Sequence, residues 1–142
     1  MSKQQVIVAP DEVETIMADW VTAKVMCGPK VTGAAGISAV ALYFEPGQGH
    51  SRHNHPDSEQ IIFVVSGQGE HTTEDEQGNR NTQKVSAGSL VYIPKGSYHA
   101  TFNTGWEPLR ILAVYSPPGP EAFMRESAEF RVLPAGKVPA RG

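Results

Sequence analysis

The sequence predicts an all-β fold, and three observations lead to this prediction. Short apolar runs of strand length recur about every 8–12 residues, which is typical of β-sandwiches and barrels. The chain of 142 residues is rich in turn formers, with 14 glycines and 11 prolines. Its length fits one domain, and its hydrophobic fraction of 39% is enough for one modest core.

Seven segments carry a strand pattern, and turn residues close most of them. Pro46-Gly47-Gln48-Gly49 follows the first segment and Ser66-Gly67 the second. The third and fourth segments form a predicted hairpin with Gly78-Asn79 at its turn. The seven expected strands are Ile37–Phe44, Gln60–Val65, Glu70–Glu74, Thr82–Val85, Leu90–Ile93, Tyr98–Asn103 and Leu109–Tyr115.

The two ends of the chain read differently from the middle. Apolar residues at helical spacing favour a short helix over Asp11–Trp20, with an irregular arm as the alternative. A second short helix is expected over Glu121–Phe130, where Phe123 and Met124 are placed to cap a barrel mouth. We therefore expect a single domain made of an N-terminal arm (1–35), a barrel core (36–119) and a C-terminal helix and tail (120–142).

Composition excludes several classes of protein. The net charge of −3 argues against a nucleic-acid binder that works by neutralising phosphates. No apolar run reaches the length of a membrane span, and the N-terminus lacks the apolar stretch of a signal peptide. Cys27 is the single cysteine, so there is no internal disulfide, and we expect a cytoplasmic protein.

Two of the five histidines suggest a metal site. On a strand, His53 and His55 point to the same face, and two neutral imidazoles begin a transition-metal site. The plain alternative is a polar loop with scattered histidines. His50 has the wrong strand parity to join them, and His71 is expected in a surface or hydrogen-bonded polar role.

Two longer patterns surround these histidines. Gly47 is followed after five residues by His53-x-His55, and Gly88 begins the pattern Gly88-x5-Pro94-x-Gly96-x2-His99-x3-Asn103. Over about residues 37–119 these segments resemble the two motifs of the cupin superfamily. The resemblance implies an antiparallel jelly-roll β-barrel that binds one divalent metal ion through His53, His55 and His99. Asn103 is expected to bond the turn backbone.

The fourth ligand of the cupin motif is a carboxylate, and here the sequence departs from the motif. Glu59 and Gln60 both lie near the required position, but strand parity lets only one of them face the metal. Register counted back from the Gly67 turn favours Gln60, with Glu59 as the alternate because the turn after His55 could deliver either. Gln60 bonded only within the barrel, with three histidines holding the metal, remains a further alternative, as does a metal-free site.

The resemblance implies a mononuclear metal cupin that acts on a small oxygenated substrate, carbonyl, carboxylate or sugar-like. The expected chemistry is isomerisation, lyase chemistry or ring opening through a metal-bound enolate. Gln also occurs at this position in cupins similar to the enzymes that linearise unsaturated uronates. The alternatives are a three-histidine iron dioxygenase and a non-catalytic ligand-binding cupin. The metal is Fe, Mn, Ni, Zn or Cu, and three imidazoles suit most of these.

Two further expectations concern proton transfer and assembly. A phenol close to the metal could serve as a proton donor, and Tyr92 and Tyr115 are the candidates. Resemblance to single-domain cupins implies a homodimer. The apolar segments Val6–Val8 and Val21–Met26 suit an added edge strand at such an interface.

Overall fold

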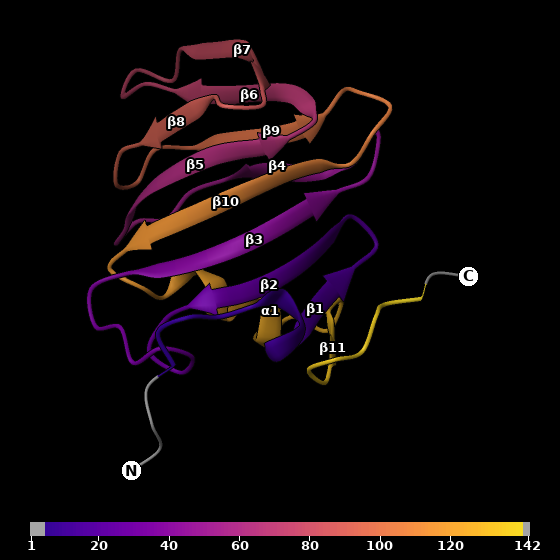
Figure 1. The fold of residues 1–142 in the computed structure, drawn as a ribbon. Coiled ribbons are helices and arrows are strands. Elements are labelled where there is room, and N and C mark those ends of the chain that lie inside the picture. Colours follow the sequence, from indigo (N-terminus) through magenta and orange to yellow (C-terminus); the bar gives the residue numbers. More distant parts are fainter. Residues whose placement is uncertain (1–4, 141–142) are drawn as a thin grey trace.

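Two antiparallel β-sheets make up the computed structural model, which describes residues 5–140 (Figure 1). The larger sheet has the strand order β11-β1-β2-β3-β10-β5-β8, and the smaller has the order β4-β9-β6-β7. The larger sheet comprises β1 (Thr15–Ala18), β2 (Val21–Cys27), β3 (Ser38–Phe44), β5 (Glu59–Ser66), β8 (Leu90–Ile93), β10 (Leu109–Ser116) and β11 (Arg131–Leu133). The smaller comprises β4 (Gly49–His53), β6 (Gln68–Glu74), β7 (Arg80–Ser86) and β9 (His99–Asn103).

Between β3 and β10 the chain passes repeatedly from one sheet to the other, because β4, β6, β7 and β9 belong to the smaller sheet and β5 and β8 to the larger. This alternation is the jelly-roll arrangement, so the predicted fold class is confirmed. All seven expected strands are present, each within two residues of its predicted ends.

The prediction of a helix over Asp11–Trp20 is wrong. The segment contains a single 3₁₀ turn, η1 (Pro10–Glu12), followed by β1. All four residues of β1 are buried and the strand pairs with β2 on one side and β11 on the other, so its sequence shows no two-residue alternation. Within residues 5–35, β1 and β2 thus belong to the larger sheet.

The N-terminal segments suggested for a dimer interface also differ from expectation. Val21–Met26 lies within β2, which pairs with β3 along one edge and, over Val21–Ala23, with β1 along the other, so strands of the same chain occupy one edge and the first half of the other. Val6 and Ile7 lie outside any strand and are exposed.

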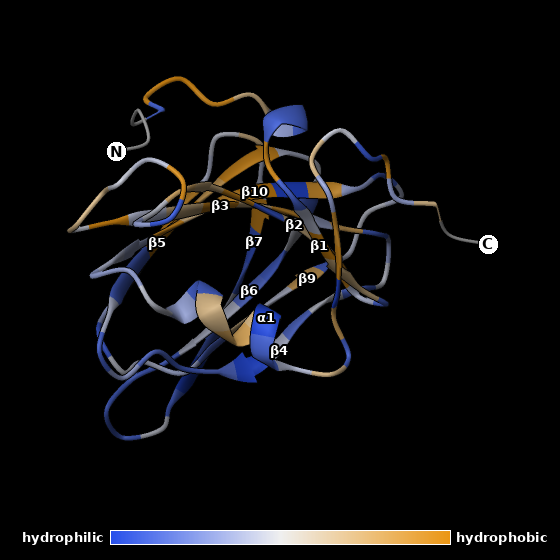
Figure 2. Ribbon diagram, turned by 90° about the horizontal axis from the view of Figure 1, so that it is seen from below, coloured by the Kyte–Doolittle hydropathy of each residue, from blue (hydrophilic) through white to orange (hydrophobic). Residues whose placement is uncertain are grey.

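The C-terminal helix is shorter than the expected Glu121–Phe130. A 3₁₀ turn, η2 (Pro120–Ala122), leads into α1 (Phe123–Glu126), and the helix ends where Ser127 becomes extended. Met124 is buried in the core, and the Phe123 ring stacks on His50 of β4 with 5.7 Å between ring centroids. Viewed from below, α1 lies between the two sheets at this end of the molecule, where Met124 packs into the core and Phe123 contacts His50 (Figure 2).

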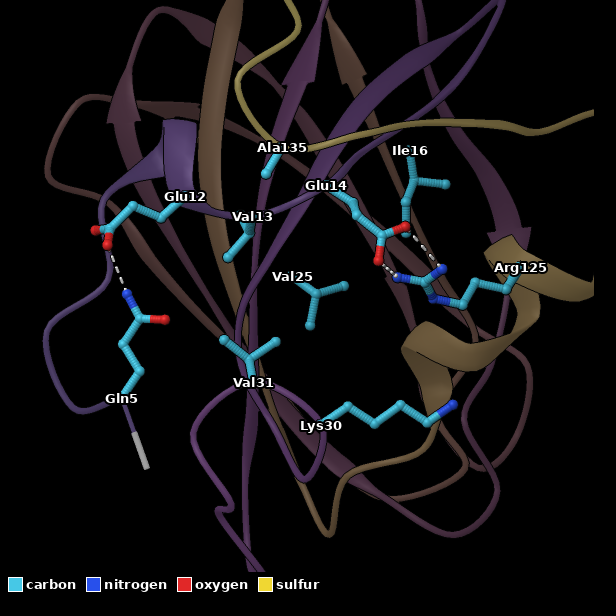
Figure 3. A pocket seen from close by; sticks show the side chains of 10 residues that line it. All are labelled: Gln5, Glu12, Val13, Glu14, Ile16, Val25, Lys30, Val31, Arg125 and Ala135. Carbon is cyan, nitrogen blue, oxygen red and sulfur yellow. Dashed lines mark hydrogen bonds and ion pairs between the residues drawn. The ribbon is translucent and has the colours of Figure 1, made fainter. Parts of the chain in front are cut away.

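An ion pair holds α1 to the start of β1. Arg125 Nη2 lies 3.2 Å from Glu14 Oε1. The pair borders a cavity of about 320 Å³ that is also lined by Gln5, Lys30 and the apolar side chains Val13, Val25 and Val31 (Figure 3). The three motif histidines do not line this cavity.

The two sheets contribute unequally to the interior. The larger sheet supplies most of the apolar core, and its central strands β3 and β10 are coloured as hydrophobic in Figure 2, whereas β4, β6 and β7 are mainly hydrophilic. The smaller sheet buries polar side chains instead, namely His71, His99, Thr101 and Asn103. A buried polar face needs internal hydrogen bonds or a ligand, so this asymmetry locates the site.

Asn103 has the structural role that its motif position implied. Its Nδ2 donates hydrogen bonds to the carbonyl oxygens of Phe44 (2.9 Å) and Glu107 (2.7 Å). Its Oδ1 accepts a hydrogen bond from the backbone N–H of Gly105 at 2.8 Å. Among the described residues, no helix is both long and apolar enough to cross a membrane.

Candidate metal centre

Three histidines meet inside the barrel. His53 ends β4 and His99 begins β9, and the two residues are paired across these adjacent strands. His55 follows in the loop after β4 and brings its ring within 5.3 Å of the His99 ring, centroid to centroid. One potential ligand atom from each of His53, His55 and His99 lies within 4.8 Å of the others.

Backbone carbonyls determine which ring nitrogen of two histidines is free. His53 Nδ1 lies 2.6 Å from the Ser51 carbonyl oxygen, and His99 Nδ1 lies 3.0 Å from that of Ser97. A carbonyl oxygen only accepts hydrogen bonds, so each Nδ1 carries the proton and each Nε2 keeps its lone pair. Such second contacts are the usual means of orienting metal-binding imidazoles.

Electrostatics keeps these rings neutral. Burial lowers the pKa of His53, with the bond to Ser51 opposing it. Burial, reinforced by the neighbouring His53, lowers the pKa of His55 to about 4 and that of His99 to about 3. Neutral imidazoles are the form that binds metal, so at neutral pH no proton has to be displaced from these nitrogens.

The structure turns Glu59 and Gln60 to opposite faces of β5. The Gln60 side chain is buried, and within residues 5–140 its Oε1 finds no hydrogen-bond partner. Glu59 is exposed, and its carboxylate accepts a hydrogen bond from the Tyr92 hydroxyl at 2.8 Å.

The available donors suit a divalent transition metal. His55 Nε2 and His99 Nε2 are buried and, like Gln60 Oε1, have no partner in the described part of the chain. Buried acceptors without partners are costly unless a ligand satisfies them. Imidazole nitrogens with an added oxygen donor are a set that such metals accept, so the residues fit a bound ion.

The two tyrosine candidates lie in different surroundings. Tyr115 is buried on β10, pairs with Gln60 across strands, and has its ring 5.2 Å from that of His55. Burial, together with the charge of Glu121, raises the Tyr115 pKa above its ordinary value. Tyr92 is 55% exposed on the outer face of β8, where the bond to Glu59 raises its pKa, so it lies away from the histidines.

His50 joins the cluster, although strand parity had assigned it to the other face. Its ring stacks on His53 with 3.5 Å between centroids and lies 4.7 Å from Trp20. The four residues of β4 from His50 to His53 lie opposite the three residues of β9 from Thr101 to His99, and this bulge reverses the parity. Burial, followed by the nearby His53, lowers the pKa of His50 to about 2.

His71 is a second inward histidine, so of its two expected roles the hydrogen-bonded polar one is confirmed and the surface one is wrong. It is 4% exposed, and its Nδ1 lies 2.8 Å from the Thr101 hydroxyl oxygen. Its Nε2 is buried without a partner among the residues that the structure covers. The available signal was the alternation of Gly69, His71 and Thr73 along one face of a predicted strand.

Comparison with known proteins identifies the family. The profile of the cupin domain matches residues 41–115, which is more than half of the chain. The chain belongs to the cupin family. This match extends from β3 to β10 and includes the three motif histidines of the cupin barrel.

The curated relatives are longer proteins with diverse names. This cupin is 30% identical over 92 residues to a putative germin-like protein 9-2 of Oryza sativa subsp. japonica, covering 65% of this chain and 42% of the relative. It is 32% identical over 74 residues to a glucose-6-phosphate isomerase of Thermococcus onnurineus, covering 52% of this chain and 38% of that protein. The cupin thus spans about two fifths of the length of these relatives.

Solved structures share the fold. KdgF from Halomonas sp. superposes with a TM-score of 0.62 at 19% identity, covering 73% of this chain and 86% of that one. Bacillus subtilis oxalate decarboxylase, whose Mn(II) centres have been studied, superposes with a TM-score of 0.68 at 22% identity, covering 72% of this chain and 27% of that one. At these identities the likeness concerns the fold.

Proposed function

We propose that this cupin is a mononuclear metal enzyme that acts on a small oxygenated substrate by redox-neutral chemistry, such as isomerisation, ring opening or a lyase reaction. The observation that carries the proposal is the convergence of His53, His55 and His99, together with the buried Gln60 Oε1, which has no partner among the described residues. Two relatives bear names of reactions on small oxygenated molecules, glucose-6-phosphate isomerase and the Bacillus subtilis oxalate decarboxylase OxdC.

The proposed ligands are His53, His55, Gln60 and His99. All four are neutral, so a bound divalent ion would keep its full charge and polarise a substrate carbonyl or carboxylate oxygen strongly. The protein's part is to hold the ligand nitrogens in place through the carbonyls of Ser51 and Ser97. Phe123 and Met124 at the barrel mouth restrict the access of water to this space.

Tyr115 is the proposed proton donor. Its raised pKa keeps the phenol protonated at neutral pH, beside His55 and Gln60. We expect Tyr115→Phe to keep its metal and to lose turnover by about 10²-fold or more, the usual contribution of a general acid. Tyr92→Phe is the matched control on the outer face, and it should retain full turnover. Equal turnover in the two variants would contradict this role.

A three-histidine iron dioxygenase is the second candidate. The observation in its favour is that the cluster contains no carboxylate, since Glu59 faces outward and bonds Tyr92. Non-haem iron oxygenases commonly add one carboxylate to two histidines, so this candidate requires a purely histidine set.

Metal analysis of untagged protein, purified without chelator, tests the proposal. We expect near one equivalent of zinc, nickel or manganese in the native protein and a clear loss of that metal in His99→Ala. Conversion of a uronate or another keto-sugar by the loaded protein would support the redox-neutral reaction. One equivalent of iron with substrate-dependent oxygen uptake would favour the dioxygenase instead. No metal even after reconstitution would leave a non-catalytic ligand-binding cupin.

A further inference from the structure

The barrel has an open seam between its two sheets. β7 is an edge strand of the smaller sheet and β8 an edge strand of the larger, and these two strands are not hydrogen-bonded neighbours. They lie together at one end of the molecule, at the top of Figure 1. A cavity of about 420 Å³ lies at this seam, lined by residues of β6, β7, β8 and the turn before β8.

Polar side chains gather on the inner side of this seam. His71 and Thr73 of β6 pair across strands with Gln83 and Asn81 of β7, and all four line the cavity. Paired residues share a face, and buried His71 identifies this face as the inner one. On the outer face of the same two strands, the Thr72 and Thr82 hydroxyls bond each other at 2.7 Å.

His71 connects the seam with the metal centre. Its Nδ1 is engaged by Thr101, whereas its Nε2 is buried without a partner within the described residues. Its ring lies 5.9 Å from the ring of His99, centroid to centroid. His71 Nε2 therefore lies between the polar cavity and the three converging histidines. A ligand that extends from the cavity to these histidines could satisfy this buried nitrogen.

We propose that the seam between β7 and β8 is a substrate subsite that binds the hydroxyl-rich part of a sugar-like molecule. His71 Nε2 forms the innermost hydrogen bond to this molecule, and its carbonyl or carboxylate end faces His53, His55 and His99. The inference rests on the proposed function, because it assigns the seam to the substrate of the same centre.

The chemistry of the lining selects this class of ligand. The amides of Asn81 and Gln83 and the hydroxyls of Thr73 and Ser89 both donate and accept hydrogen bonds, as sugar hydroxyls do. No carboxylate lines the cavity among the described residues, so nothing there repels an acidic sugar. Val91 adds an apolar contact that suits the C–H face of a sugar ring.

A titration followed by NMR tests the subsite on the full chain loaded with Zn²⁺. D-Glucuronate is the probe, and propionate, which carries the carboxylate without hydroxyls, is its matched control. We expect D-glucuronate to shift the side-chain amide signals of Asn81 and Gln83 saturably and propionate to leave them in place. Gln83→Met should weaken binding about fivefold, the effect of one neutral hydrogen bond, and Thr82→Val on the outer face should not change it.

His71 is tested by two substitutions that separate its ring nitrogens. In His71→Asn, the shorter amide can replace the Nδ1 contact to Thr101, but no group remains at the position of Nε2. In His71→Gln, the longer side chain keeps a polar group near the position of Nε2. We expect His71→Asn to weaken D-glucuronate binding about fivefold or more at unchanged zinc content, and His71→Gln to retain most of it. Loss of zinc from His71→Asn would place His71 among the metal ligands and overturn its assigned role.

The remaining outcomes separate this inference from the proposed function. Conversion of D-glucuronate without any shift at Asn81 and Gln83 would overturn the subsite and leave the enzyme proposal standing. Saturable shifts at both amides, with no sugar acid converted, would support the subsite and count against the enzyme. Absence of both shifts and conversion, or equal shifts with propionate, would overturn the subsite.

Discussion

At the scale of single residues, the neighbours Glu59 and Gln60 offer the sharpest test of the site. They differ by one strand position, yet Glu59 is exposed and bonded to Tyr92, whereas Gln60 is buried and its Oε1 has no partner within residues 5–140. We expect Gln60→Ala to weaken metal binding by about tenfold or more, since even outer partners of metal ligands contribute that much. Glu59→Gln should bind metal normally.

A competition titration against a chelator measures both affinities under the same conditions. If only the Glu59→Gln variant binds metal more weakly, the assignment of Gln60 as a metal ligand is wrong. Unchanged binding in both variants would mean that the three histidines hold the metal without a fourth side chain.

At the scale of elements, the pairing of β4 with β9 carries two of the proposed ligands. Gly49 lies against β9 so closely that a Cβ there would meet the Thr101 carbonyl oxygen and lie 2.6 Å from Phe102 Cα. We expect Gly49→Ala to lower the free energy of unfolding by about 1–3 kcal/mol, the usual cost of overpacking, and to weaken metal binding by separating His53 from His99.

Gly36→Ala is the matched control, because a Cβ there meets no atom within 4 Å. Urea denaturation of both variants, with metal titration of each, gives the comparison. A Gly49→Ala protein as stable as Gly36→Ala would show that β4 moves freely relative to β9.

At the scale of the whole molecule, the buried histidines predict acid sensitivity of the metal-free protein. The pKa values of His55 and His71 are lowered from 6.5 to about 4, mainly by burial. Between pH 6.5 and about pH 4, the unfolded chain binds more protons than the folded chain. The free energy of unfolding therefore rises with pH in this range, and it falls as the pH is lowered from 6.5 towards 4. The slope should be about 1.4 kcal/mol per pH unit for each histidine that stays neutral.

Urea denaturation in the presence of chelator, repeated from pH 7 to pH 5, measures this slope. His71→Asn should reduce it, because one of the titrating groups is then absent. A free energy of unfolding that does not change over this range would contradict the burial of neutral imidazoles.

Assembly is the other prediction at this scale. Large apolar side chains of β5 and β8 are exposed on the outer face of the larger sheet: Phe63 39%, Val65 46%, Leu90 59% and Tyr92 55%. Apolar side chains gathered in this way are typical of protein interfaces. We expect a homodimer through this face, with twice the chain mass of 15.3 kDa in light scattering. A mass of one chain would overturn this prediction, and Leu90→Lys should dissociate the dimer.

Local patterns along the chain predict most strands of the barrel, the turns and the motif positions of this cupin. Strand periodicity and turn residues are local properties, so seven of the eight strands from β3 to β10 could be predicted, as could the bonding of Asn103 to its turn. The strand that was not predicted is β4, whose sequence is polar. The resemblance also singled out His53, His55 and His99, because the motif lies in their spacing along the chain.

Features that depend on contacts between distant parts of the chain could not be predicted in this way. β1 shows no strand alternation because residues on both of its faces are buried, and the helical spacing of its apolar residues was therefore misleading. His50 turns inward because a bulge against β9, about 50 residues later, reverses its parity. His71 can be buried because its Nδ1 forms a hydrogen bond with the Thr101 hydroxyl of β9. Pairing between strands far apart in the chain leaves no trace in local periodicity, and that pairing determines which polar groups face the interior.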